Sequence, residues 1–76
     1  MIGYASAMDI VDTPIVSANA GASPPTITVG QAGDRQVIAT TAAMCERARE
    51  LLATRGHATA KVRYPLGGER EIVTVE

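Results

Sequence analysis

Apolar and polar residues alternate most regularly near the C-terminus, on either side of two adjacent glycines. Ala58–Leu66 and Glu69–Glu76 have the pattern of strands, and Gly67 and Gly68 between them are typical of a tight hairpin turn. A two-residue turn predicts the register Leu66 opposite Glu69, Tyr64 opposite Glu71, Val62 opposite Val73 and Ala60 opposite Val75. The other face of this hairpin would then meet solvent.

A helical spacing of apolar residues precedes the hairpin and predicts a helix from Asp34 to Arg55. Asp34 is a good N-cap, and Gly56 is suited to the left-handed conformation that ends many helices. The residues expected on the buried side are Val37, Ile38, Ala42, Met44, Cys45, Ala48, Leu51 and Leu52.

The segment before this helix predicts one further strand and leaves the N-terminal third open. Thr26–Val29 is rich in β-branched residues, and Gly30 and Gly33 predict a turn after it. Residues 1–25 contain a weaker alternation from Tyr4 to Val11, so they form either additional short strands or an N-terminal arm. We therefore expect a core over residues 26–76 and a separate segment over 1–25.

These elements predict an α+β fold, namely a two-layer sandwich of one long helix on a mixed sheet of three to five strands. The expected order of the core is β-α-β-β. The connection from Thr26–Val29 through the helix to Ala58–Leu66 would be a crossover between parallel strands.

The length of 76 residues limits the chain to a single small domain. A domain of this size buries a modest fraction of its surface, so binding to a partner or to a second copy would add stability. The composition has no Phe or Trp and a net charge of -1, which gives no bulk electrostatic attraction to nucleic acid. The chain has no apolar run long enough to cross a membrane and no basic segment at its start, so we expect a cytoplasmic protein.

The stretch Val29–Arg35, with Gly30 and Gly33 three residues apart, invites a comparison with phosphate-binding loops. No lysine follows the second glycine, and Asp34 places a carboxylate where a phosphate would lie. We therefore interpret these residues as a turn and a helix cap, with binding of phosphate or an RNA backbone as the weaker alternative.

Two charged surfaces are the candidates for binding. The predicted helix carries Glu46, Arg47 and Glu50 on its solvent side, which suggests an acidic patch for a basic groove of a partner. The solvent face of the hairpin carries the basic residues Lys61, Arg63 and Arg70. Each set is also compatible with an ordinary solvated surface, and the basic set lacks the aromatic rings that stack on bases.

The sequence offers no combination of residues for catalysis. Cys45 and His57 are the only pair of a nucleophile and a base of that kind, and the predicted helix separates them. A single cysteine and dispersed acids suggest no metal site, and we expect no cofactor.

We therefore expect a non-enzymatic module that covers a surface of a larger protein or ribonucleoprotein complex. One concrete form is a small inhibitor carried by a phage or mobile element, of the anti-CRISPR type, because such proteins are often short and lack motifs. Pairing of two copies through an edge strand is a further possibility. The alternative function is a small nucleic-acid-binding or regulatory module that uses Lys61, Arg63 and Arg70 together with the Gly30–Gly33 loop.

Overall fold

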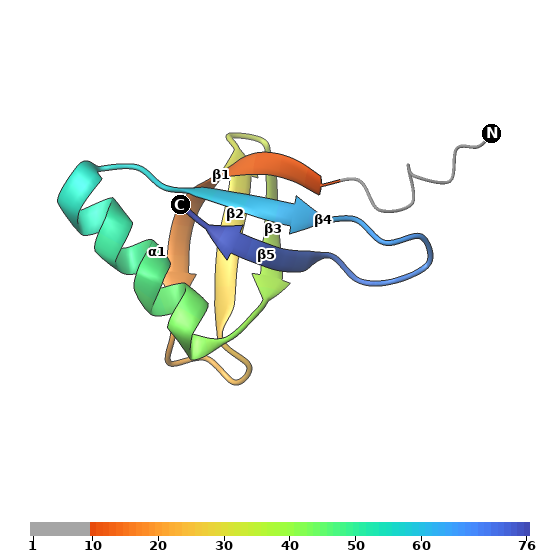
Figure 1. The fold of residues 1–76 in the computed structure, drawn as a ribbon, viewed down its shortest axis with the longest axis horizontal. Coiled ribbons are helices and arrows are strands. Elements are labelled where there is room, and N and C mark those ends of the chain that lie inside the picture. Colours follow the sequence, from red (N-terminus) through yellow and green to blue (C-terminus); the bar gives the residue numbers. More distant parts are fainter. Residues whose placement is uncertain (1–9) are drawn as a thin grey trace.

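The computed structural model describes residues 10–76, which form five strands and one helix (Figure 1). The early part of the alternation predicted from Tyr4 onward lies outside the described residues. The elements are β1 (Ile10–Asn19), β2 (Thr26–Gln31), β3 (Asp34–Ala39), α1 (Ala42–Arg55), β4 (Thr59–Arg63) and β5 (Glu71–Val75).

All five strands belong to one antiparallel sheet in the order β3-β2-β1-β4-β5. The α+β class is therefore confirmed, whereas the expected mixed sheet with a parallel crossover is wrong. The helix does not lead from one strand to a parallel neighbour. It connects β3 at one edge of the sheet to β4 on the other side of β1.

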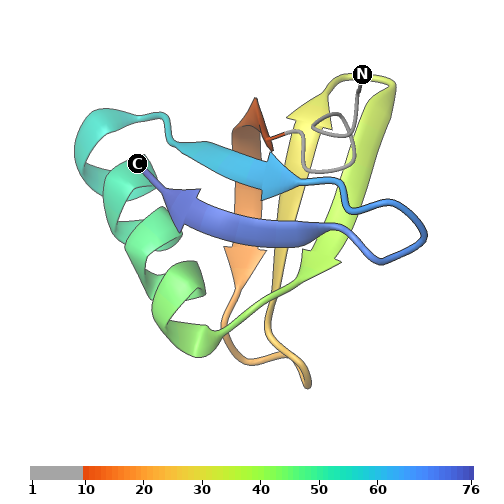
Figure 2. The same cartoon turned by 45° about the vertical axis from the view of Figure 1, so that its right-hand side comes forward.

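The central strand β1 pairs with different neighbours along its two halves. Ile10–Pro14 pairs with β4, and Ile15–Asn19 pairs with β2 on the opposite edge. The register shifts between Ile15 and Ser17, so Val16 is an extra residue in a β-bulge, a feature that bends and twists a strand. As a result, β4 and β5 run crosswise to β2 and β3 (Figures 1 and 2).

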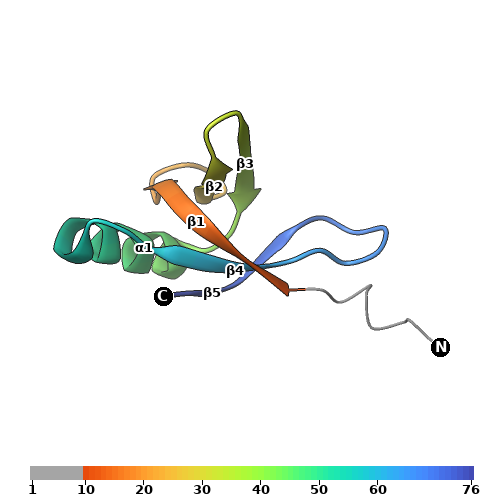
Figure 3. The same ribbon diagram turned by 90° about the horizontal axis from the view of Figure 1, so that it is seen from above.

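The bend folds the sheet around a single core, and α1 covers one end of it (Figure 3). Buried side chains come from every element: Ile15, Ile27, Val29, Ile38, Cys45, Ala48, Leu51, Ala58, Ala60, Val62, Ile72 and Val75. Because the two halves of β1 pair with strands that run crosswise to each other, the sheet is more strongly curved than the flat layer of a two-layer sandwich.

The predicted helix begins too early, because Asp34–Ala39 forms a strand. This segment pairs with β2 along its whole length, from Gln31 opposite Asp34 to Thr26 opposite Ala39. Val37 is 68% exposed and Ile38 is 4% exposed, which is the alternation of a strand and not of a helix. The β-branched pair Val37–Ile38 favours this outcome.

Gly30 and Gly33 form the β2–β3 hairpin and not a loop at a helix N-terminus. Both have positive φ, of 112° and 88°. A side chain on Gly30 would overlap the backbone carbonyl oxygen of Asp34, whereas one on Gly33 would meet open space. The close approach of the two strands at Gly30 therefore requires glycine.

The ends of α1 are capped by residues on either side of it. Thr41 is the N-cap, and its Oγ1 accepts a hydrogen bond from the Met44 N–H at 3.2 Å, so the prediction that Asp34 caps the helix is wrong. Gly56 has φ of 82° and donates its N–H to the Leu52 carbonyl at 3.0 Å. Cys45, Ala48 and Leu51 form the buried stripe of the helix.

The C-terminal hairpin has the predicted register at one end only. Ala60 lies opposite Val75, as expected, but a register shift after Lys61 places Val62 opposite Ile72. Ile72 is therefore buried, although the two-residue turn predicted it on the solvent face. Seven residues from Tyr64 to Arg70 separate the strands, and within them Gly68 donates its N–H to the Pro65 carbonyl at 3.2 Å. Gly67 takes a φ of 75° in this turn.

The position of β1 bears on the boundary expected after Pro25. Because β1 lies between β2 and β4, Ile10–Asn19 belongs to the same sheet as the other described strands.

Candidate functional site

The three basic residues of the C-terminal hairpin are already engaged within the fold. Lys61 Nζ lies 2.9 Å from Asp12 Oδ1, and Arg63 Nη1 lies 3.1 Å from Glu71 Oε1. The guanidinium of Arg70 lies over the Tyr64 ring, 5.3 Å from its centroid. Two of the three cations therefore have a carboxylate partner, whereas the charge of Arg70 is not neutralised by the Tyr64 ring.

The ion pair between Lys61 and Asp12 also changes the pKa of the lysine. The hydrogen bond to Asp12 and the negative charge of that carboxylate raise the pKa of the Lys61 ammonium above its ordinary value. The pair joins the first half of β1 to β4, where Asp12 and Lys61 are direct partners in the sheet. The Lys61–Asp12 pair is therefore explained as a contact between neighbouring strands.

The solvent side of α1 combines the predicted acidic residues with several arginines. The helix carries Glu46 and Glu50 together with Arg47, Arg49 and Arg55, so its formal charge is positive. Glu50 Oε1 lies 3.6 Å from Arg47 Nη1, as the spacing predicts, while Glu46 and Arg49 form no such pair. The neighbouring arginines weaken the electrostatic argument for an acidic helix opposite a basic sheet, which stays a prediction.

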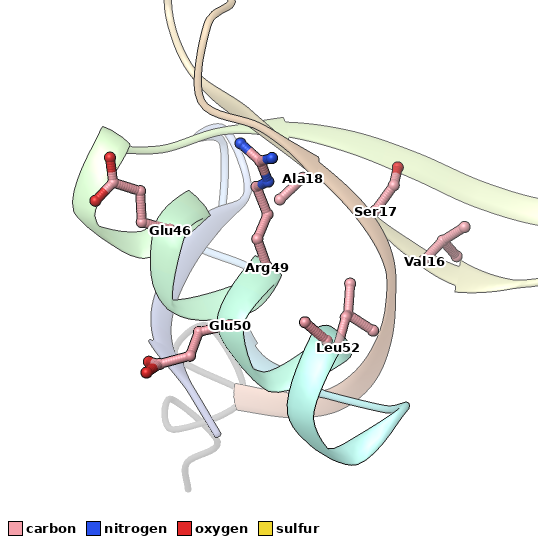
Figure 4. Close-up of a pocket in the computed structure, with 8 residues that line it drawn as sticks. Val16, Ser17, Ala18, Glu46, Arg49, Glu50 and Leu52 are labelled. Atoms are coloured by element: carbon pink, nitrogen blue, oxygen red, sulfur yellow. The ribbon is translucent and has the colours of Figure 1, made fainter.

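An open groove of about 790 Å³ runs between the second half of β1 and α1 (Figure 4). The strand contributes Val16, Ser17 and Ala18, and the helix contributes Glu46, Arg49, Glu50, Leu52 and Ala53. The side chains of Arg49 and Leu52 extend from the helix toward the strand, whereas Glu46 and Glu50 point toward its outer side (Figure 4). The groove thus combines apolar side chains with an arginine that extends toward the strand and two glutamates that point away from it.

One wall of this groove is a strand edge without a neighbouring strand. β4 pairs with β1 only as far as Pro14, and the Ile15 N–H donates to the Ala58 carbonyl at 2.9 Å. Beyond that bond, Ser17–Asn19 pairs with β2 on one edge, and the other edge of this segment faces the groove. Such an edge offers backbone hydrogen bonds to another chain.

Cys45 and His57 do not come together as a catalytic pair. Cys45 is fully buried, and its Sγ donates to the Thr26 carbonyl at 3.3 Å. Burial raises the pKa of this thiol above its ordinary value, which keeps it protonated and unreactive. His57 is exposed beyond Gly56, at the other end of the helix.

Within residues 10–76, no group of three or more His, Cys, Asp or Glu side chains is placed to hold a metal ion. The same part of the chain has no helix of the length and apolar character needed to span a membrane.

Reasoning from the sequence proposed Glu46 and Glu50 as part of a charged binding surface but did not identify the groove that they line. No pattern in the sequence singled out Arg49 or Val16–Ala18 as part of a binding surface. The bulge at Val16 depends on how β1 meets two neighbours, so no local pattern predicts it. The β-branched run Thr26–Val29, the turn after it and Val37–Ile38 together could have predicted the β2–β3 hairpin.

Comparison with protein-family models, with curated proteins and with solved structures finds no match for this chain. The fold by itself does not assign a function.

Proposed function

We propose that this chain is a non-enzymatic protein-binding module that docks onto a partner through the groove between β1 and α1. The observation that carries the proposal is the combination in that groove of an unpaired strand edge, apolar side chains and a charged group. Recognition of extended peptides uses these features, since the edge provides affinity and the neighbouring side chains provide specificity.

The rigidity of the groove walls favours this surface over the loops. The strand wall is held by β2, and the helix wall is held by the buried residues Cys45, Ala48 and Leu51. A surface on packed elements loses little conformational entropy on binding. In contrast, the loop from Tyr64 to Arg70 exposes Leu66 by 86% without a second wall around it.

The alternative of nucleic-acid binding has less support. Proteins that bind single-stranded nucleic acid stack bases on exposed aromatic rings. The exposed residues of β2 and β3 include Arg35 and Val37, and neither strand contains an aromatic residue. The ring of Tyr64 in the loop is partly covered by Arg70, and Lys61 and Arg63 have carboxylate partners.

The narrower version of the proposal is that the module covers a surface of a larger protein or ribonucleoprotein complex as an inhibitor carried by a phage or mobile element. This version rests on the small size of the chain and not on any feature of the groove. Identification of the partner would decide whether this narrower version is correct.

The proposal is tested by capture from nuclease-treated bacterial lysate with matched variants. Ala53→Arg fills the groove, and Ala43→Arg makes the same change on an exposed position of the same helix that does not line it. A partner should be lost with Ala53→Arg and retained with Ala43→Arg, and thermal unfolding should show both variants folded. A partner that is lost only when Lys61 and Arg63 are both changed to Ala would contradict the proposal, as would retention of nucleic acid alone.

A further inference from the structure

The backbone of Ala18 faces the groove with its N–H and C=O. Residues of an antiparallel strand direct these groups alternately to the two sides. The Thr40 N–H donates to the Pro25 carbonyl at 2.8 Å, so Ile38, two residues earlier in β3, also faces β2. Its partner Ile27 therefore turns its backbone groups toward β3 and away from β1. Ala18 lies opposite Ile27, so its own groups point to the uncovered edge.

Nothing else in the described part of the chain satisfies these two groups. The hydrogen bonds from loops, caps and side chains within residues 10–76 include none to the Ala18 N–H or C=O. A backbone donor and acceptor side by side on a strand edge are the groups that an added strand pairs with. The uncovered segment of four residues, Val16–Asn19, is about 13 Å long.

Arg49 provides a charged group beside this edge. Its guanidinium extends from α1 toward Ala18 (Figure 4), and no carboxylate within residues 10–76 lies close enough to form a salt bridge with it. Leu52 and Ala53 continue the same wall with apolar surface. An occupant of the groove would therefore meet a cation and an apolar surface on the side away from the strand.

We propose that the groove binds an extended segment of a partner protein, which pairs with Ala18 as an added strand and places a carboxylate against Arg49. The segment carries an aliphatic side chain toward Leu52 and Ala53. This inference rests on the proposed function and specifies the conformation and chemistry of the bound segment. Two copies that met through their β1 edges would have to bring both grooves together, so the proposal takes a separate partner as the occupant, and binding of a second copy through its β3 or β5 edge is an outcome that the test can reveal.

The inference is tested with a displayed library of random heptapeptides selected on the immobilised full chain. We expect enrichment of sequences that alternate β-branched or aliphatic residues with others, carry Asp or Glu and lack a central proline. The most enriched peptide is then synthesised and titrated into the ¹⁵N-labelled protein. Its binding should shift the amide signals of Val16–Asn19 and slow hydrogen exchange at the Ala18 N–H.

Matched changes in the peptide and in the protein distinguish the backbone pairing at Ala18 from the charged contact with Arg49. Methylation of the peptide nitrogen that faces Ala18 should abolish binding without any change in the protein. Replacing the peptide Glu by Gln, or Arg49→Gln, should each weaken binding about five- to tenfold, because a charge-assisted hydrogen bond is lost. Arg47→Gln changes a neighbouring arginine that does not line the groove and should leave the affinity unchanged.

Three results would overturn the inference. They are enrichment of basic or helical peptides, binding that leaves Ala18 exchange unchanged, and the absence of enrichment over the bare support. None of these bears on lysate capture with Ala53→Arg and Ala43→Arg, which requires no strand pairing. Failure of the inference and failure of the proposed function are therefore distinguishable.

Discussion

Single residues determine how closely the strands of this small protein approach one another. Gly30 is buried in β2 with positive φ, and a Cβ there would overlap the Asp34 carbonyl oxygen. Gly33 also has positive φ but faces open space. Substitutions at the two positions therefore distinguish the energetic cost of a left-handed backbone from the cost of a steric clash.

Replacing each of these glycines by alanine should give different losses of stability. Gly33→Ala should cost about 1 kcal/mol of unfolding free energy, because only the left-handed backbone is penalised. Gly30→Ala should cost about 2–4 kcal/mol, since the hairpin must also shift to relieve the clash with Asp34. Urea denaturation of both variants measures the difference, and equal losses would contradict the geometry at Gly30.

The elements of the chain follow from local patterns where those patterns are unambiguous. The second half of the predicted helix, its C-cap at Gly56 and the strands around Ala60 and Val75 appear where the sequence placed them. The predicted start at Asp34 is wrong, because Val37 and Ile38 satisfy a short helical pattern and a strand pattern equally. Pairing with β2 decides between the two, and that contact is not local.

The groove between β1 and α1 could not be predicted from local sequence patterns. It depends on the two partners of β1, the bulge at Val16 and the position of α1 beside the uncovered edge. Each of these is a relation between elements that are distant in sequence. The glutamates that line the groove were predicted as a binding surface because of their charge. The position of Arg49 beside the strand edge becomes apparent only in the three-dimensional structure.

The N-cap of α1 allows a prediction about how much one hydrogen bond stabilises the helix. Thr41→Ala removes the hydroxyl that accepts the Met44 N–H and should cost about 1 kcal/mol. Thr54→Ala serves as the control on the same helix, because the Thr54 hydroxyl only donates to the Glu50 carbonyl at 2.8 Å. It should change stability by less than about 0.5 kcal/mol. Equal effects of the two substitutions in thermal unfolding would contradict the assignment of Thr41 as the cap.

The whole molecule should lose stability as the solution becomes alkaline. Burial raises the pKa of Cys45 above its ordinary value of 9.0, and Asp12 raises that of Lys61 above 10.5. The folded state therefore binds these protons more tightly than the unfolded state. Their contribution is constant below about pH 9 and is lost as the pH rises through the raised pKa values.

Denaturation curves between pH 7 and pH 11 test this expectation. Cys45→Ala should flatten the slope that begins near pH 9 and leave the later loss due to Lys61. Lys61→Met should remove the later loss and leave the earlier one. A free energy of unfolding that is constant or rises over this range would contradict both pKa directions.

The claim that the groove is the working surface is tested most directly by hydrogen–deuterium exchange of the chain with and without a captured protein partner. The account predicts slower exchange at Val16–Asn19 and in the second half of α1, with no change in β4 and β5. Protection confined to the β4–β5 hairpin around Lys61 and Arg63, with the groove unchanged, would contradict it.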